Sequence, residues 1–140
     1  MSKLDNIVDN FELLGDWEQR YEYLVGLGEK LPVMPEQFRT DANRVKACMS
    51  KVWVVAYPHH GRIRFHGDCD TSVIKGVLAL LIDVCSDLTA DEISAIDMDE
   101  IFERLHLDAH LSPNRHIGVY AMFDLMKQKA RLSAQTSQAA

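Results

Sequence analysis

The chain has 140 residues, of which 47% are hydrophobic and 26% charged, a composition typical of one globular domain with a hydrophobic core. Its formal net charge of −6 argues against non-specific binding to nucleic acid or to an anionic membrane, because both need a basic surface. No apolar run is long enough to span a bilayer, and the first residues lack the apolar core of a signal peptide. Three cysteines in a chain of this length do not resemble a disulfide framework, which predicts a reducing compartment, most simply the cytoplasm.

The N-terminal part of the chain predicts two tightly joined helices. Apolar residues recur at helical spacing between residues 4 and 14. Gly15 then ends this helix, and Asp16 is typical of the N-cap of the next one, over residues 16–29. We therefore expect an αα-hairpin, followed by an extended, proline-containing linker over residues 31–35.

The middle of the chain predicts a small antiparallel sheet of about three strands. Residues 51–57 are rich in β-branched and aromatic side chains on both faces, so this strand should be covered on both sides. An incoming strand over residues 43–47 alternates basic and apolar residues, which predicts one solvated face. After a turn at residues 58–61, residues 62–66 alternate in the same way and form the third strand.

Cys48 lies in the short loop between the first two predicted strands. A rigid scaffold that holds a thiol on such a loop is a common way to build a reactive site. Reactivity depends on the thiolate fraction, which nearby cations such as Lys46 and Lys51 raise. The alternative is that Cys48 is a small, inert, buried residue.

The other two cysteines border a strongly apolar helix. Cys69 precedes the N-terminus of this helix, where the macrodipole favours a thiolate, whereas its neighbours Asp68 and Asp70 raise a thiol pKa. Cys69 is therefore a rival to Cys48 as a reactive thiol. Cys85 lies on the apolar stripe of the helix, which predicts a place in the core.

The rest of the chain is predicted to be helical. Two short helices follow Thr89, the second around residues 97–105, and a proline at the first helical position opens a last helix at Pro113. The pattern predicts an α+β fold, with one domain over residues 1–132 and a disordered tail at 133–140.

Polar residues gather where the last helix begins. They are His110, Asn114, Arg115 and His116. Two interpretations remain open for this cluster: local capping and solvation, or a polar wall beside the Cys48 loop.

With these residues in view, the chain resembles the SufE family of sulfur-acceptor proteins over roughly residues 7–132. Three blocks of residues carry the resemblance, in order along the chain. They are Asn43-Arg44-Val45, Cys48, Ser50 and Val52-Trp53; then Gly67-Asp68, Asp70 and Lys75-Gly76; then His110-Leu111-Ser112-Pro113, Arg115 and Gly118. One such block would be weak evidence, but three at fitting distances are a specific signal.

The resemblance implies a function and a fold. SufE-like proteins accept sulfane sulfur on a loop cysteine from the persulfide of a PLP-dependent cysteine desulfurase, stimulate that enzyme, and pass the sulfur on for iron–sulfur cluster assembly. Carried over by position, Cys48 is the acceptor, with Asp70, Arg115, His110 and Ser50 in supporting or interface roles. No cofactor or metal is implied on this chain, because PLP stays on the partner.

The implied partners are the desulfurase and a downstream iron–sulfur scaffold, with no nucleic acid and no membrane, and the chain would act as a monomer or homodimer. The implied fold, a helical hairpin and C-terminal helices around a small antiparallel sheet, resembles that of iron–sulfur scaffold proteins.

Three positions depart from the family pattern. The family usually has Gly before the loop cysteine and Gln after it, where this chain has Ala47 and Met49. Ala47 should restrict the loop, and the apolar Met49 favours a more buried resting position. Cys69 stands where the family more often has Ser, so the resemblance gives it no required role.

Three other functions remain open from the sequence. One is an iron–sulfur or zinc-binding scaffold that uses Cys48, Cys69 and Cys85 with a carboxylate or histidine. Another is a thiol peroxidase or other redox enzyme in which Cys48 attacks and Cys69 resolves, and the third is an adaptor without thiol chemistry. The adjacent His59 and His60 lack companion ligands, so no metal site is predicted in their turn.

Overall fold

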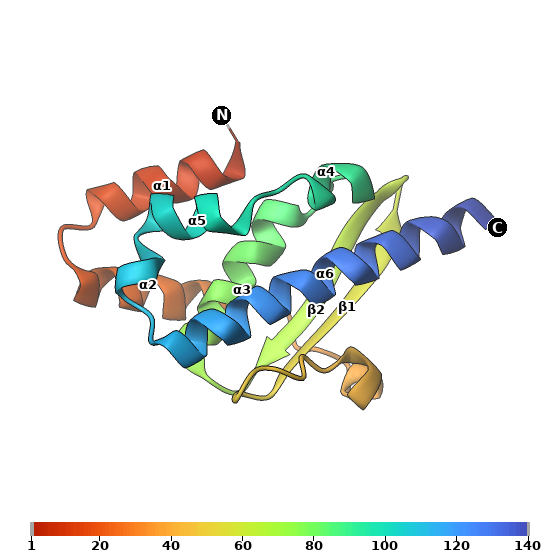
Figure 1. Cartoon of the computed structure of the whole chain (residues 1–140), viewed down its shortest axis with the longest axis horizontal. Coiled ribbons are helices and arrows are strands. Elements are labelled where there is room, and N and C mark those ends of the chain that lie inside the picture. The colour runs from red at the N-terminus through yellow and green to blue at the C-terminus, as the bar shows by residue number, and fades with distance from the viewer. Residues whose placement is uncertain (1, 140) are drawn as a thin grey trace.

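The computed structural model describes residues 2–139, and side chains as far as residue 135. Within that range it places helices around a two-stranded antiparallel sheet (Figure 1), which confirms the predicted α+β class. In chain order the elements are α1 (Lys3–Leu13), α2 (Trp17–Glu29), β1 (Val52–His59), β2 (Arg62–Cys69), α3 (Ser72–Cys85), α4 (Ala90–Ser94), α5 (Met98–Leu105) and α6 (Pro113–Ala139). Short 3₁₀ helices cover Glu36–Phe38, Asp41–Asn43 and Leu107–Ala109.

The predicted helical hairpin forms, and its caps explain where its helices begin. The Ser2 hydroxyl accepts a hydrogen bond from the backbone N–H of Asp5, whose carboxylate accepts one from the N–H of Ser2. Asp16 caps α2 with its side chain, which accepts from the N–H of Gln19. The second helix of the hairpin, α2, crosses α3 so closely that a Cβ at Gly76 would lie 2.0 Å from the carbonyl oxygen of Leu24. This crossing fixes the position of α3, and hence of the α3 N-terminus near the Cys48 loop.

The sheet contains two strands rather than the predicted three. The strands β1 and β2 pair from Val52 opposite Cys69 to the tight turn after His59. The segment before Cys48 makes a single bridge, Arg44 opposite Trp53, with the N–H of Val45 donating to the carbonyl of Val52 at 2.9 Å. The chain turns directly after this bridge, at residues 46–47, so no ladder can extend along it.

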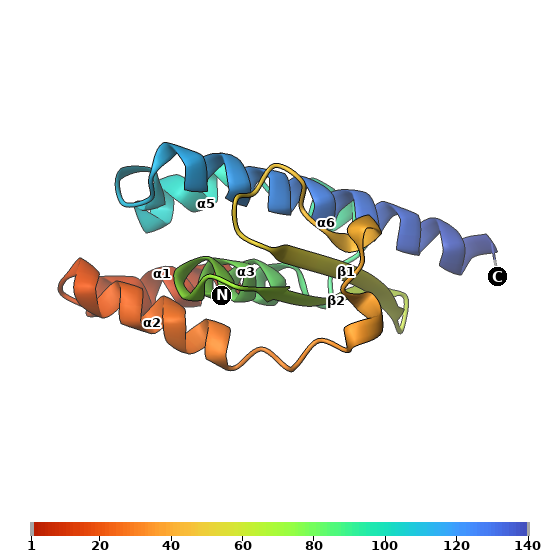
Figure 2. The same ribbon diagram turned by 90° about the horizontal axis from the view of Figure 1, so that it is seen from below.

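The two faces of the sheet are covered differently. On one face α3 packs against β2 and α6 against β1, and Figures 1 and 2 both show α6 running beside the strands. The opposite face of β1 is half-buried, and there the Arg39 guanidinium, from the segment between α2 and β1, lies 5.2 Å from the centre of the Trp53 ring. The predicted two-sided cover of β1 is therefore complete on the helical face and partial on the other.

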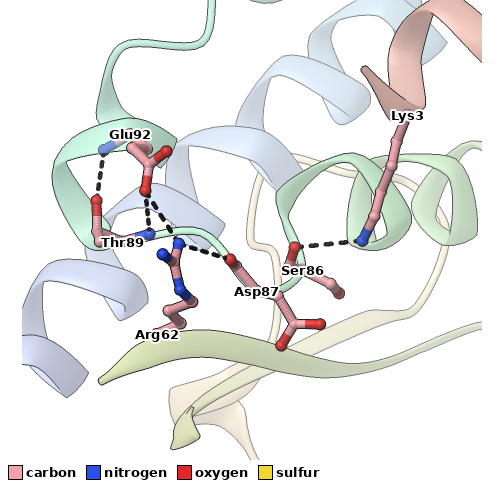
Figure 3. Close-up of polar contacts among 6 residues, drawn as sticks. All are labelled: Lys3, Arg62, Ser86, Asp87, Thr89 and Glu92. Carbon is pink, nitrogen blue, oxygen red and sulfur yellow. Dashed lines mark hydrogen bonds and ion pairs between the residues drawn. The ribbon is translucent and has the colours of Figure 1, made fainter. Parts of the chain in front are cut away.

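Polar contacts tie the hairpin end of the sheet to the connection between α3 and α4 (Figure 3). The Arg62 guanidinium donates to the Asp87 carbonyl at 3.1 Å and lies 3.4 Å from the Glu92 carboxylate. Glu92 also forms a capping box with Thr89 at the start of α4. The Lys3 ammonium donates to the carbonyl at the C-terminal cap of α3. These contacts lie at the end of the strands opposite to Cys48.

The helix α6 continues through Ala139, whereas the sequence predicts a disordered tail from residue 133. Residues 133–139 contain neither glycine nor proline, so nothing in this stretch interrupts helical hydrogen bonding. Residue 140 lies outside the described part. None of the described helices combines the length and the apolar character needed to cross a membrane.

Candidate functional site

Hydrogen bonds fasten the loop that carries Cys48 at both of its ends. At its start, the bridge before residue 46 holds the chain against β1. At its end, the N–H of Lys51 donates to the Asp70 carboxylate at 3.0 Å, and the N–H of Asp70 donates to the Lys51 carbonyl at 3.1 Å. The hydroxyls of Ser50 and Thr71 are 2.6 Å apart. The loop is thus attached to the segment that leads from β2 into α3.

The Cys48 thiol is half-buried and packs against α6. A Cβ at Gly118 would lie 2.8 Å from the Cys48 sulfur, which is closer than real Cβ contacts come. Only glycine therefore allows the thiol this position. Lys46, the nearest preceding cation in the sequence, points to Asp41 and not to the thiol, with 3.8 Å between its ammonium and the carboxylate.

A pocket of about 260 Å³ opens beside the thiol. It is lined by Cys48, Met49, Ser50, Thr71, Ile74, Ser112, Asn114 and Arg115. Three segments that are far apart in sequence build it: the loop, the start of α3 and the start of α6. Met49 is 84% exposed, so the expectation that this apolar residue favours a buried loop is wrong.

Arg115 is the cation of this pocket. Its side chain is exposed, and the described residues place no carboxylate within ion-pair distance of it. Its backbone N–H donates to the Ser112 hydroxyl at 3.4 Å, which is a weak cap at the start of α6. The pocket therefore presents a thiol, hydroxyl and amide groups, and one guanidinium able to attract an anionic group.

The structure brings together four of the five predicted site residues. Ser50 and Asp70 hold the Cys48 loop, and Arg115 lines the pocket. His110 does not line it, because its ring stacks on that of Trp17 at 3.7 Å between centroids and 11° between planes.

The predicted polar wall is therefore divided. Asn114 and Arg115 line the pocket, whereas His116 contacts the Phe102 ring edge-on and His110 is held by α2. The Tyr21 hydroxyl donates to the His110 carbonyl at 2.6 Å, which fastens the turn before α6. His110 thus positions the start of α6 and does not contribute its ring to the pocket.

Burial distinguishes the other two cysteines from Cys48. Burial raises the pKa of Cys69 to about 11, although the N–H of Thr71 points at its sulfur from 3.4 Å. Burial likewise raises the pKa of Cys85 to about 12. On sequence alone, the helix N-terminus favours a Cys69 thiolate. In the structure, burial disfavours this thiolate more strongly than the helix N-terminus stabilises it.

Two residues of the site were not assigned a role from sequence. Gly118 was part of the third block, but nothing local in the sequence places it under Cys48. Thr71 has the residue type of a helix cap, yet no capping hydrogen bond from its side chain is found and its hydroxyl meets Ser50. Tertiary contacts alone define both roles.

The described residues contain no group of three or more His, Cys, Asp or Glu side chains arranged to hold a metal ion. His59 and His60 contact each other at 4.3 Å between ring centroids, at the far end of β1 from Cys48. No set of ligands in this range supports the scaffold alternative.

Most of the chain matches a known protein family. The SufE family model, described as an Fe-S metabolism associated domain, matches residues 5–130. The chain belongs to the SufE family. A SufE-like protein of Rhizobium etli is 37% identical over 138 residues, covering 96% of this chain and 93% of the relative. The cysteine desulfuration protein SufE of Wigglesworthia glossinidia brevipalpis is 32% identical over 127 residues, covering 90% of this chain and 88% of its own length.

A solved structure agrees with the fold of this SufE-family chain. The solution structure of a hypothetical protein from Thermus thermophilus superimposes with a TM-score of 0.79 and covers 96% of this chain and 99% of the other. The two sequences are only 19% identical, so this likeness concerns the fold alone.

Proposed function

We propose that this SufE-family chain accepts a sulfane sulfur atom on Cys48 from the persulfide of a PLP-dependent cysteine desulfurase. In doing so it clears the persulfide of that enzyme and stimulates it, and it then passes the sulfur on for iron–sulfur cluster assembly. The observation that carries the proposal is the half-buried Cys48 thiol on an anchored loop, facing a pocket beside Arg115. The name of the Wigglesworthia relative, a cysteine desulfuration protein, supports the same role.

The transfer is a thiol–persulfide exchange. The Cys48 thiolate attacks the terminal sulfur of the partner persulfide, a new S–S bond forms on Cys48, and the original S–S bond breaks. The electron pair of the broken bond remains on the partner cysteine, which leaves as a thiolate. No external oxidant or reductant is consumed, and no cofactor is needed on this chain because PLP serves the desulfurase.

The pocket offers space for the added sulfur. The Cys48 sulfur is pressed against Gly118 on one side, so a further sulfur atom has room only on the side of the pocket. The groups of Ser50 and Asp70 that hold the loop would keep the loaded sulfur close to the protein surface. A partner protein that binds the extended conformation of the loop more tightly than the resting one would expose the loaded sulfur.

Mass spectrometry after incubation with a cysteine desulfurase and cysteine tests the proposal. The protein should gain the mass of one sulfur atom, removable by a reductant, and the peptide that contains Cys48 should carry it. Cys48→Ser should lose this gain completely, whereas Cys85→Ala, which changes a thiol buried in α3, should load as the natural chain does. Loading that persists in Cys48→Ser would refute the assignment.

A further inference from the structure

Cys69 lies beside the point where the Cys48 loop enters β1. Cys69 is the last residue of β2 and pairs with Val52, the residue at which the loop enters β1. Side chains of directly paired residues point to the same face of a sheet, and both of these are buried, with 6% of Cys69 exposed. Cys69 therefore faces the helix-covered side of the sheet, where Cys48 also packs against α6.

Short contacts join the two cysteine segments. The Ser50 hydroxyl meets that of Thr71 at 2.6 Å, and the N–H of the same Thr71 points at the Cys69 sulfur. Thr71 also lines the pocket beside Cys48, so one residue touches both thiol environments. In addition, the Cys48 charge is among the influences that raise the pKa of Cys69, after the larger effect of burial. Both residues are free thiols.

We propose that Cys69 is a resolving thiol, which discharges a Cys48 persulfide that is not handed on. This inference rests on the proposed function. The Cys69 thiolate attacks the inner sulfur of the persulfide, on Cys48 itself, and a Cys48–Cys69 disulfide forms. The bond to the outer sulfur breaks, and that sulfur leaves as hydrosulfide with the bonding electron pair. The proton lost by Cys69 goes to solvent, and the persulfide supplies the oxidising equivalents, so no other oxidant is needed.

Burial sets the rate of this step. With a pKa raised to about 11, Cys69 is ionised in roughly one molecule in ten thousand at neutral pH. Resolution is therefore slow, and a waiting acceptor would take the sulfur first. A carrier without an acceptor would instead become a disulfide that cannot be loaded, until a small thiol reductant restores it. The pair acts as a delayed shut-off of sulfur transfer.

Loading without a downstream acceptor tests the proposal. The chain is charged with a cysteine desulfurase and cysteine, desalted, and followed by intact mass and by sulfide release. The natural chain should release one sulfide per persulfide and end with the mass of the reduced protein less two hydrogen atoms. Cys69→Ser should keep its persulfide, whereas Cys85→Ala should behave as the natural chain does.

A second arm separates this inference from the proposed function. Treatment of the unloaded natural chain with diamide, a thiol oxidant, should produce a disulfide between the peptides that contain Cys48 and Cys69, without any desulfurase. If the chain loads but releases no sulfide, or if diamide yields no such peptide pair, the resolving role is overturned while sulfur acceptance stands. If the chain never loads, the proposed function fails and the resolving role with it, whatever the diamide result says about the reach of the two thiols.

Discussion

At the scale of single residues, the site depends on the smallest side chain in it. Gly118 lies on a helix, where glycine costs roughly 0.5–1 kcal/mol relative to alanine. The chain accepts this cost at a position where a methyl group would meet the Cys48 sulfur at 2.8 Å. The resting position of the thiol therefore depends on a residue far away in sequence.

Gly118→Ala should destabilise the protein and push the thiol outward. Crowding in a packed site costs about 1–3 kcal/mol, partly offset by the better helix propensity of alanine. Cys48 should also react faster with a bulky maleimide. Gly26→Ala is a matched control, because Gly26 is also helical but has nothing within 4 Å of an added Cβ. Chemical denaturation should show Gly26→Ala to be slightly more stable than the natural chain; equal behaviour of the two variants would contradict the contact.

At the scale of elements, the Cys48 loop is a short segment held at its ends. The sequence predicts a strand, a cysteine-containing turn and a second strand, and the turn and second strand are present. The incoming strand is reduced to one bridge because the chain turns at residues 46–47, directly after Val45. The alternation of basic and apolar residues correctly predicts a buried Val45 and an exposed Lys46, but Ala47 is exposed as well. The alternation cannot reveal where pairing stops.

The Thr71 hydroxyl should restrain this loop. Thr71→Val keeps the shape of the side chain but removes its hydrogen bond to Ser50, worth about 1 kcal/mol, and its longer one to the Asp70 carboxylate. Opening of the loop should become roughly fivefold more frequent, and alkylation of Cys48 should accelerate to the same extent. Thr40→Val is the control, since no hydrogen bond of its side chain is present among the described residues.

A desulfurase partner should also open this loop. In the natural chain, adding a catalytically inactive desulfurase should raise the rate of Cys48 alkylation. An unchanged rate would contradict a loop that the partner opens.

At the scale of the whole molecule, the site is a meeting point of three distant segments. Local patterns located the loop, the start of α3 and the start of α6, and most helix ends, because caps and hydrophobic spacing are local signals. They could not show that Arg115 reaches the pocket while His110 stacks on Trp17, since that choice is made by the packing of α2 against the turn before α6. The family resemblance identified three blocks of residues in order along the chain. Only the fold shows which residues of these blocks lie at the pocket and which do not.

A half-buried carboxylate at Asp68 joins three segments of the fold. Its oxygens lie 2.6 Å from the Arg39 guanidinium, in the segment between α2 and β1, and 3.1 Å from the Lys75 ammonium in α3, while Asp68 itself belongs to β2. Burial alone would raise the pKa of Asp68, but these two cations and the N–H of Cys69 overcome it and lower the pKa below its usual value of 3.8. A depressed pKa in the folded state contributes stability that is present above the usual value, and this contribution is lost as the pH falls through the folded-state value.

Asp68→Asn should therefore destabilise the protein at neutral pH and matter less in acid. Hydrogen bonds to a charged group of this kind are worth on the order of 1–3 kcal/mol, and solvent at the half-buried site favours the lower end. The difference in unfolding free energy between the natural chain and the variant should shrink as the pH falls from 3.8 through the lowered folded-state pKa of Asp68, below which Asp68 is neutral in both states. Asp83→Asn, on the exposed face of α3, controls for the lost charge and should change little at either pH. A difference that stays constant from neutral to strongly acidic pH in denaturant titrations would show that shape, and not charge, makes Asp68 the link between the segment before β1, the sheet and α3.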